Sequence, residues 1–309
     1  MIRYITQRAL LGFATLIGVV LLVFVAVRLT GDPAMLYLPL DASQEARDHF
    51  SAQHGFDDPI PVQLLAYVAG ILHGDFGVSL RRSEPALQVV LQHYPNTLLL
   101  AFLGLAGALV LAVVLGAASG AKPMSRLDRG TGVVSLACAS IPDFWLALVL
   151  IFGLAVRGGL FPTSGTGGPE YWVLPVVTIM ARPFGLLTQV VRGAMVDAMA
   201  APYIATGRSK GLPERRVVFV HALRNAWLPI VTVAGDLAVS LVNGAIVVES
   251  VFGIPGVGRL LIDAVYQRDF AIVQAVIIVT GTTIILLNLA IDLLYARINP
   301  RIRVEARFA

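Results

Sequence analysis

Charged residues are scarce in this chain. Asp, Glu, Lys and Arg make up 14% of its 309 residues, whereas hydrophobic residues make up 57%. Together with a mean hydropathy of +0.80, this composition leaves more apolar surface than one water-surrounded core can bury, which argues against an ordinary soluble protein. The net charge of +4 is modest and the basic residues do not form an amphipathic face, which excludes nucleic acid as an expected partner. Membrane lipid is the expected solvent.

Cysteine is almost absent. The single residue, Cys138, lies in an apolar run, so no intramolecular disulfide and no cluster of metal-bound thiolates can form. Four of the five histidines fall in one polar segment, at separations of 5, 19 and 20 residues that match no compact metal site. They are His49, His54, His73 and His93. We interpret them as solvated or structural side chains and expect no metal and no cofactor in this chain.

Catalytic signatures are missing as well. The sequence has no Gly-x-Ser-x-Gly and no His-Glu-x-x-His motif. The stretch "GIPGVGRL" (253–260) is glycine-rich, but a phosphate-binding loop needs Lys and then Ser or Thr after its last glycine, where this chain has Arg259 and Leu260. We interpret the stretch as a structural loop that packs tightly through its glycines. We expect no catalytic residue and no ATPase site of the chain's own.

Long apolar runs, in contrast, are abundant. A membrane core needs roughly 20 apolar residues as a helix, and six runs of that kind occur, at about 10–29, 97–121, 131–156, 172–191, 227–250 and 271–296. The first run lacks a convincing small-x-small cleavage site after it and is expected to remain as an anchor. The sequence therefore predicts an all-α integral membrane protein, with residues 1–309 forming one domain of six transmembrane helices.

The basic residues predict the orientation of these spans. Fifteen of the 23 Lys and Arg residues fall on the side that holds both termini, seven fall on the other side, and Arg182 lies within a span. Because Lys and Arg concentrate in cytoplasmic loops, both termini are predicted to be cytoplasmic. Residues 30–96 then form an external insertion between the first two spans, and residues 193–226 form a cytoplasmic loop.

The densest basic stretch is "TGRSKGLPERRVVFVHALRNAWLP" (206–229). Pro202 suits a first helical position, Gly211 suits the residue just past a helix end, and Pro213 opens a second helix through about Ala226. Isolated helices below about 12 residues are marginal in water, so the short first helix needs a surface to lie against. That surface is a partner protein, unless the cations only enforce topology and contact phospholipid headgroups.

The stretch "YIATGRSKGLPERRVVFVHALRNAWLP" (203–229) resembles the cytoplasmic coupling loop of ABC-importer permeases, in the variant of the peptide and nickel permease family. The general importer pattern is Glu-Ala-Ala, three residues and a glycine, and this chain matches only the glycine strictly, as is usual in the peptide branch. The resemblance implies that the short helix docks in a groove of an ATP-binding subunit and transmits its closure to the spans. The residues assigned to this coupling are Ala205, Thr206, Gly207, Arg208, Lys210, Gly211, Leu212, Glu214 and Arg215.

Further stretches resemble the same family, in particular the paralogue with a long external loop after its first span. They follow one another in family order and cover most of the chain: 55–80, 141–150, 249–275 and 291–303. The resemblance implies the type I ABC importer permease fold, in the bacterial cytoplasmic (inner) membrane. It also implies a second homologous permease subunit, two ATP-binding subunits that hold ATP and magnesium, and an external substrate-binding protein.

The function implied by the resemblance is ATP-driven import of di- or oligopeptides. The same family also imports nickel chelates, opines and glutathione, and the sequence leaves the choice of cargo open. The alternative from a different class is a secondary transporter, which an ion gradient would drive without an ATPase partner.

Polar and ionisable residues at membrane depth mark a candidate translocation path, because such groups are costly in lipid and usually face a cavity or a partner. They are Asp143, Arg182, Asp236 and Asn243. Two interpretations stay open. Arg182 neutralises Asp143 or Asp236 in a buried pair that holds the helices together, or these side chains line the cavity that contacts zwitterionic cargo.

Overall fold

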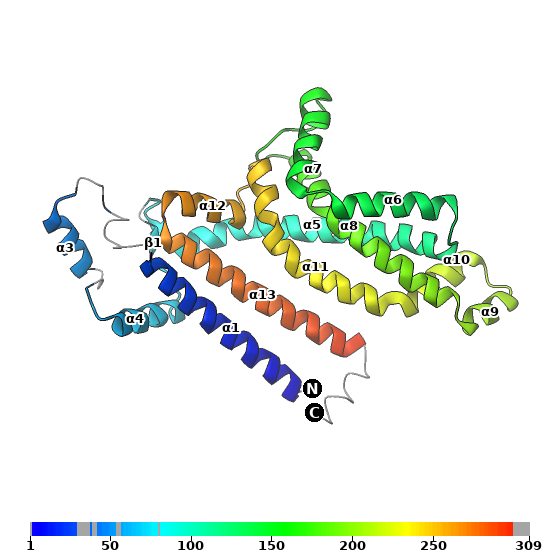
Figure 1. Ribbon diagram of the computed structural model, residues 1–309, viewed down its shortest axis with the longest axis horizontal. Coiled ribbons are helices and arrows are strands. Elements are labelled where there is room, and N and C mark those ends of the chain that lie inside the picture. Colours follow the sequence, from blue (N-terminus) through cyan, green and yellow to red (C-terminus); the bar gives the residue numbers. More distant parts are fainter. Residues whose placement is uncertain (1, 30–37, 39–41, 54–56, 80, 299–309) are drawn as a thin grey trace. The chain divides into compact units, whose positions relative to one another are not determined.

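Helices form nearly all of the chain in the computed structural model, which describes residues 2–29, 38, 42–53, 57–79 and 81–298 (Figure 1). The chain divides into two compact units, each described here by itself. Unit 1 contains Met1–Pro95 and Arg259–Leu289, and unit 2 contains Asn96–Gly258 and Ala290–Ala309. Three helices, α5, α12 and α13, contribute to both units.

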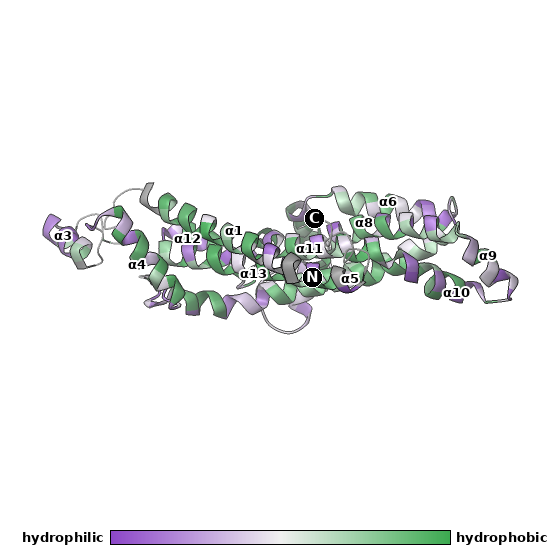
Figure 2. Ribbon diagram, turned by 90° about the horizontal axis from the view of Figure 1, so that it is seen from below, coloured by the Kyte–Doolittle hydropathy of each residue, from purple (hydrophilic) through white to green (hydrophobic). Residues whose placement is uncertain are grey.

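Unit 1 combines long apolar helices with shorter helices and a small hairpin. Its helices are α1 (Ile2–Leu29), α3 (Gln44–Gln53), α4 (Ile60–Leu72), the first part of α5 (Ala86–Ala121), most of α12 (Val257–Gln267) and most of α13 (Phe270–Ile298). A two-stranded antiparallel hairpin, β1 (Val78–Ser79) and β2 (Glu84–Pro85), pairs Val78 with Pro85 and Ser79 with Glu84. In Figure 2 the long helices are mostly green, whereas α3 is largely hydrophilic.

Close contacts hold unit 1 together. Gly12 of α1 lies so near Ile285 of α13 that a Cβ at Gly12 would be 2.7 Å from the Ile285 side chain. The Ser79 hydroxyl of the hairpin donates to the Asp269 carboxylate, at the turn between α12 and α13. Asp269 also accepts from the Ile272 amide in the first turn of α13. The hairpin therefore depends on residues about 190 positions later in the chain.

Unit 2 is built around α8. Its elements are the rest of α5, then α6 (Arg126–Ser140), α7 (Asp143–Leu150), a π-helix η1 (Ile151–Arg157), α8 (Glu170–Met199), α9 (Pro202–Ser209), α10 (Glu214–Arg216), a second π-helix η2 (Val217–Ala222) and α11 (Leu223–Phe252). In its most apolar window, 56% of α8 is buried, against 22% to 28% in the other long spans. α8 is therefore the central helix of this unit.

Glycines bring neighbouring helices against α8. A Cβ at Gly120 of α5 would lie 2.6 Å from Met195 of α8. On another side of α8, a Cβ at Gly185 would lie 2.4 Å from the Ser135 carbonyl oxygen of α6. Such small-residue contacts let helix backbones approach closely, which drives helix packing where lipid removes the hydrophobic effect.

The six predicted spans all fall on helical segments, which confirms the all-α class. In the described part of the chain, four helices are long and apolar enough to cross a membrane, or up to five if one bent pair counts as a single span. The apolar part of α1, Leu10–Ala26, is shorter than that criterion requires. The number of six transmembrane helices and the side of both termini stay predictions.

The third predicted span, 131–156, differs from the expected continuous helix. α6 and the helix formed by α7 and η1 meet at an angle of 107°. Ile141 and Pro142 at this break both have extended backbone, with ψ of 128° and 138°. Proline lacks an amide hydrogen and disfavours helical backbone in the residue before it, so the helix stops here. The third predicted span is therefore sharply broken at Pro142 in the structure.

The contact between α6 and α8 predicts a test of packing. We expect Gly185→Ala to lower the thermal unfolding midpoint of the purified chain, because the added methyl group overlaps Ser135 and Ala139. The matched control is Gly193→Ala in the same helix, where a Cβ meets nothing within 4 Å. Since Ala favours a helix over Gly by about 0.5–1 kcal/mol, the control should keep or raise the midpoint. Equal midpoints for both variants would contradict this description of the interface.

Candidate coupling and translocation sites

The short helix α9 is anchored by a single buried residue. Ile204 is 1% exposed and packs in a cluster that includes Met195 of α8 and Val217 of η2. Other residues of α9, among them Ala205, Thr206 and Arg208, are exposed. The helix therefore presents most of its surface outward while its one apolar anchor joins it to α8 and to the helix that follows.

Local sequence explains why α9 begins and ends where it does. Pro202 occupies its first position, where a missing amide hydrogen costs nothing. Gly211 has φ of +75°, in the left-handed region that glycine adopts without a Cβ penalty. The amide of Leu212 then donates to the Gly207 carbonyl at 3.3 Å. The predicted helix, glycine stop and second helix are all confirmed, with one difference: the second helix runs from Glu214 to Phe252 instead of ending near Ala226.

Arg208 is engaged within the chain. Its guanidinium donates to both carboxylate oxygens of Glu214, at 2.7 Å and 3.2 Å, and so joins α9 to the start of α10. The Glu214 carboxylate raises the pKa of Arg208. Both side chains are 48% exposed, so solvent screens the attraction between them strongly. The pair orients the two helix ends more than it stabilises the fold.

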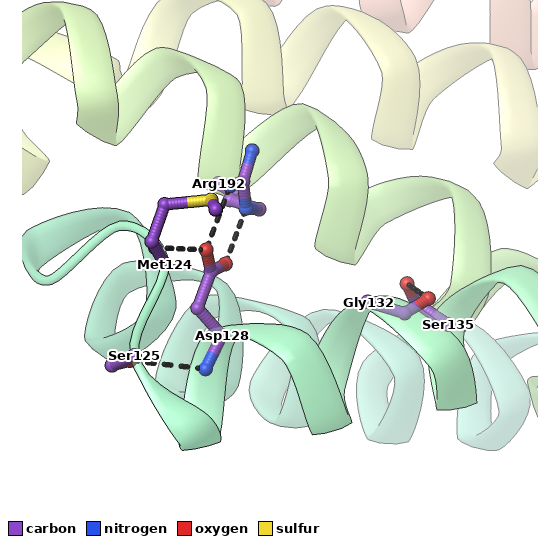
Figure 3. Close-up of polar contacts among 6 residues, drawn as sticks. All are labelled: Met124, Ser125, Asp128, Gly132, Ser135 and Arg192. Atoms are coloured by element: carbon purple, nitrogen blue, oxygen red, sulfur yellow. Dashed lines mark hydrogen bonds and ion pairs between the residues drawn. The ribbon is translucent and has the colours of Figure 1, made fainter.

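A second ion pair joins α6 to α8 (Figure 3). Arg192 of α8 donates to both carboxylate oxygens of Asp128 in α6, one of the contacts measuring 2.8 Å. Asp128 is only 4% exposed. Its Oδ2 also accepts from the amide of Met124 at 2.8 Å. A paired, nearly buried carboxylate thus ties α6 and the turn before it to the last turns of α8.

The turn between α5 and α6 is shaped around this carboxylate (Figure 3). Met124 has φ of +66°, which is uncommon for a residue with a side chain. Ser125 caps α6 by accepting from the Asp128 amide at 3.2 Å. The Asp128 carboxylate, which accepts the Met124 amide, therefore helps to hold the turn in an unfavourable conformation.

A buried carboxylate organises the opposite end of unit 2. Glu249 of α11 is 0% exposed. Its Oε1 accepts from the Thr97 hydroxyl of α5 at 2.6 Å, and its Oε2 accepts from the Gly258 amide at 2.8 Å. A Cβ at Gly256 would lie 2.1 Å from its carboxyl carbon. The glycine-rich loop 253–258 is therefore folded around Glu249, which confirms its interpretation as a tightly packed structural loop.

The candidate translocation residues have different surroundings. Asp143, the first residue of α7, is half-buried, and Arg182 of α8 is the charged group that acts on it. Within the described residues, the pair does not approach to direct ion-pair distance. Arg182, Asp236 and Asn243 are exposed. Both interpretations of these four residues therefore stay predictions.

Asp236 and Asn243 belong to a polar stripe along α11. From Thr232 onward, the exposed residues of this helix recur at steps of three and four, which places them on one helix face. They are Thr232, Asp236, Ser240, Asn243, Val247 and Ser250. On α8, Arg182, Gln189 and Asp197 are exposed in the same manner. Lipid does not accommodate such faces cheaply, so they need water or a partner chain.

Sequence reasoning did not identify Asp128 or Glu249 as organising residues, and it counted Arg192 only as a determinant of topology. Asp128 follows Ser125 by three residues, a spacing typical of a helix start. Glu249 follows an apolar run and precedes a loop with three glycines, at 253, 256 and 258. Both patterns are visible in the sequence, but neither indicates the distant partner, which is Arg192 for Asp128 and Thr97 for Glu249.

The sequence is similar to a known protein family and to several permeases. The family model "Binding-protein-dependent transport system inner membrane component" matches residues 108–304. The oligopeptide transport system permease protein AppB of Bacillus subtilis (strain 168) is 36% identical over 314 residues, covering 98% of this chain and 99% of AppB. The dipeptide transport system permease protein DppB of Escherichia coli (strain K12) is 34% identical over 336 residues, covering 98% and 99%. The glutathione transport system permease protein GsiC of Salmonella choleraesuis (strain SC-B67) is 35% identical over 306 residues, covering 99% and 100%.

Two solved structures share the fold at low sequence identity. A chain of the MetNI methionine ABC transporter, in an inward-facing conformation, aligns with a TM-score of 0.58 and 17% identity, covering 69% of this chain and 97% of that chain. A chain of an amino acid ABC transporter crystallised with histidines aligns with a TM-score of 0.54 and 15% identity, covering 68% and 94%. These likenesses concern the fold alone.

The Asp128–Arg192 pair predicts an asymmetry between single and double variants. We expect Arg192→Ala to reduce folded yield, because it leaves the nearly buried Asp128 carboxylate without its cation, a cost of about 1–3 kcal/mol or more. The double variant Asp128→Asn/Arg192→Gln should lose less, since no unpaired charge remains. Arg129→Ala is the matched control: Arg129 is exposed one residue away, and its loss should leave the yield unchanged. A double variant no better than Arg192→Ala would refute the pair's role.

Proposed function

Because the chain belongs to the family of inner membrane components of binding-protein-dependent transport systems and has the type I ABC importer permease fold, we propose that it carries di- or oligopeptides across the membrane. The observation that carries this proposal is the identity of 34% to 36%, over nearly the full chain, with permeases named for oligopeptides and dipeptides. A glutathione permease is similarly related, and glutathione is itself a tripeptide. Nickel chelates and opines are the alternative cargoes.

The chain is a multi-pass membrane protein, and in our proposal it lies in the cytoplasmic membrane of a bacterium with both termini inside. Its partners are a second homologous permease subunit, two ATP-binding subunits and an external substrate-binding protein. ATP and magnesium bind to the ATP-binding subunits, so the chain needs no cofactor or catalytic residue of its own. The family description, which names a binding-protein-dependent system, supports these partners.

Coupling to ATP hydrolysis runs through α9 in this proposal. Residues 205–212 dock in a cleft of the ATP-binding subunit, supported by the exposure of α9 on every side except that of Ile204. Arg208 is held by Glu214 within the chain, so Lys210 and Arg215 remain as the cations for acidic groups of the partner. The other coupling residues, Ala205, Thr206, Gly207, Gly211 and Leu212, supply the shape of the docking element.

Movement of α9 reaches the spans through two connections. Ile204 packs in one cluster with Met195 of α8 and Val217 of η2, so a push on α9 acts on both long helices. The Arg192 guanidinium, one turn before Met195 on α8, grips Asp128 of α6. Because packed helices shift as rigid elements between discrete arrangements, α6, α8 and the start of α11 respond together. Through this link, the ATP-binding subunits can change the side of the membrane to which the transport path is open.

The transport path in this proposal includes Asp143, Arg182, Asp236 and Asn243. Its support is the polar stripe of α11, which exposes Asp236, Ser240 and Asn243 on one face of an otherwise apolar helix. Peptides carry a cationic and an anionic terminus at neutral pH. Carboxylates and a guanidinium with amide and hydroxyl groups between them suit such a cargo, since each terminus finds the opposite charge.

The function is tested with purified subunits in liposomes. The permease pair, the ATP-binding subunits and the binding protein should accumulate a radiolabelled dipeptide only when ATP is inside with the ATP-binding subunits and the binding protein is outside. A secondary transporter would instead accumulate the peptide under a proton or sodium gradient without ATP. ATP-driven accumulation of a nickel chelate or an opine, with peptides excluded, would move the cargo assignment to those alternatives.

The docking proposal predicts which substitutions uncouple the transporter. Gly211→Val should abolish ATP-driven uptake while the spans still insert, because a β-branched residue is strongly disfavoured at a φ of +75°. A Cβ at this position meets nothing within 4 Å, so the effect comes from backbone conformation and not from a clash. Gly211→Asn should retain part of the activity, because Asn tolerates the left-handed region better.

Gly193→Ala is the control for these variants. Gly193 lies in α8, outside the coupling residues, has no positive φ, and a Cβ there meets nothing within 4 Å. It should keep uptake near the wild-type rate. Uptake and co-purification of the ATP-binding subunit are measured for each variant. Wild-type uptake by Gly211→Val would rule out docking through the conformation of this loop.

A further inference from the structure

The helix α4 turns an apolar face outward. Ile60 and Pro61 at its start are exposed, and from Val62 to Leu72 the exposed residues recur at steps of three and four and so occupy one side of the helix. They are Val62, Leu65, Ala66, Ala69 and Leu72, of which Leu65 is 71% and Leu72 is 79% exposed. The polar Gln63 and Tyr67 lie among the less exposed residues. A helix in water shows the reverse pattern, with its polar side chains outward and its apolar ones covered.

The length of α4 and the residues at its two ends limit what it can do. Its 13 residues span about 20 Å at 1.5 Å per residue, which is too short for the roughly 30 Å of a membrane core. Asp57 and Asp58 precede it, and His73 and Asp75 follow it. Both ends are therefore polar, which suits a helix whose two ends stay at the water boundary and not one that enters the membrane end-on.

A ring contact places α4 beside α1, the first of the predicted spans. Tyr67, in the middle of α4, packs against Phe24 of α1 with ring centroids 5.6 Å apart. Phe24 is 2% exposed and lies five residues before the end of α1, at Leu29. The apolar run of α1 extends through Ala26. The less exposed side of α4 therefore rests on the last turns of α1 (Figure 1). Near this end α1 also exposes apolar side chains, Leu22 at 69% and Val25 at 50%, so the outward apolar face of α4 adds to an exposed apolar surface of α1.

We infer that α4 is an interfacial helix whose apolar face lies in the lipid of the membrane surface, parallel to the membrane plane. The topology proposed above makes this the external leaflet. The insertion between the first two spans is thus not entirely a water-exposed segment: α3 is polar, whereas α4 holds the segment down on the membrane next to α1. Anchoring of this kind fixes where the rest of the insertion, including the hairpin that follows α4, lies on the external surface.

The chemistry of the face favours lipid over a protein partner. Its members are aliphatic and small, without an aromatic, a charged or a hydrogen-bonding side chain. Protein interfaces are enriched in Tyr, Trp and Arg at their centres and carry polar groups that set the orientation of the partner. Lipid tails require only an apolar surface of sufficient area. Because α4 lies beside the predicted span α1, lipid is present at this position.

Site-directed spin labelling tests the inference on the complete transporter in nanodiscs of phosphatidylethanolamine and phosphatidylglycerol. In a Cys138→Ser background, labels are attached at Leu65→Cys and Ala69→Cys, on the outward face of α4. The control is Ala46→Cys, an exposed alanine on the polar helix α3 of the same insertion. Collisions with oxygen, which concentrates in lipid, are compared with collisions with a nickel chelate, which stays in water.

Oxygen collisions should dominate at both α4 positions, with a depth of about 5–10 Å below the headgroup boundary, and chelate collisions should dominate at Ala46. All three positions are exposed in the folded chain, so the labels leave its packing undisturbed. Dominant chelate collisions at Leu65 and Ala69 would place the face in water and overturn the inference. Low collision rates with both reagents, or a label immobilised only after the binding protein is added, would overturn it in favour of a protein partner.

Discussion

A charged side chain in an apolar helical protein needs either a fitted partner or water, and this constraint orders the whole structure. Glu249 meets it with the Thr97 hydroxyl and the Gly258 amide, at the end of α11. Asp128 meets it with Arg192 and the Met124 amide, between α6 and α8. Each partnership joins segments far apart in the sequence. The few buried charges of this chain therefore act as fixed points between helices that lipid alone would hold loosely.

Unit 2 depends on these fixed points at both ends. Close glycine contacts let α5 and α6 approach α8, and Asp128 then locks α6 to the last turns of α8. The short helix α9 follows directly and adds only Ile204 to the core. An element that is attached so lightly, yet next to a rigid ion pair, is suited to transmit movement. The polar stripe of α11 is the contrasting case, because its one charged residue, Asp236, is exposed.

Much of the fold could be predicted from local sequence, because the relevant physics is local. Pro202, Gly211 and Pro213 place the boundaries of α9 and of the next helix through backbone preferences that each residue carries by itself. The break of the third predicted span was harder to predict from local sequence. Proline at 142 indicates a kink, but the angle of 107° depends on how α7 packs against α8 and α11. The membership of an importer family was also accessible, since its motifs extend over most of the chain.

By itself, the sequence determined that the chain is helical, that lipid is its solvent, and where the coupling helix starts and stops. Those properties follow from composition, periodicity and single-residue backbone preferences, which act over a few neighbouring positions. Only the tertiary structure decided that Arg192 pairs with Asp128, that Glu249 accepts a hydrogen bond from Thr97, and that Arg208 pairs with Glu214. The reason is that a charge signals its need for a partner wherever it stands, but the helix packing selects which partner comes within hydrogen-bond distance.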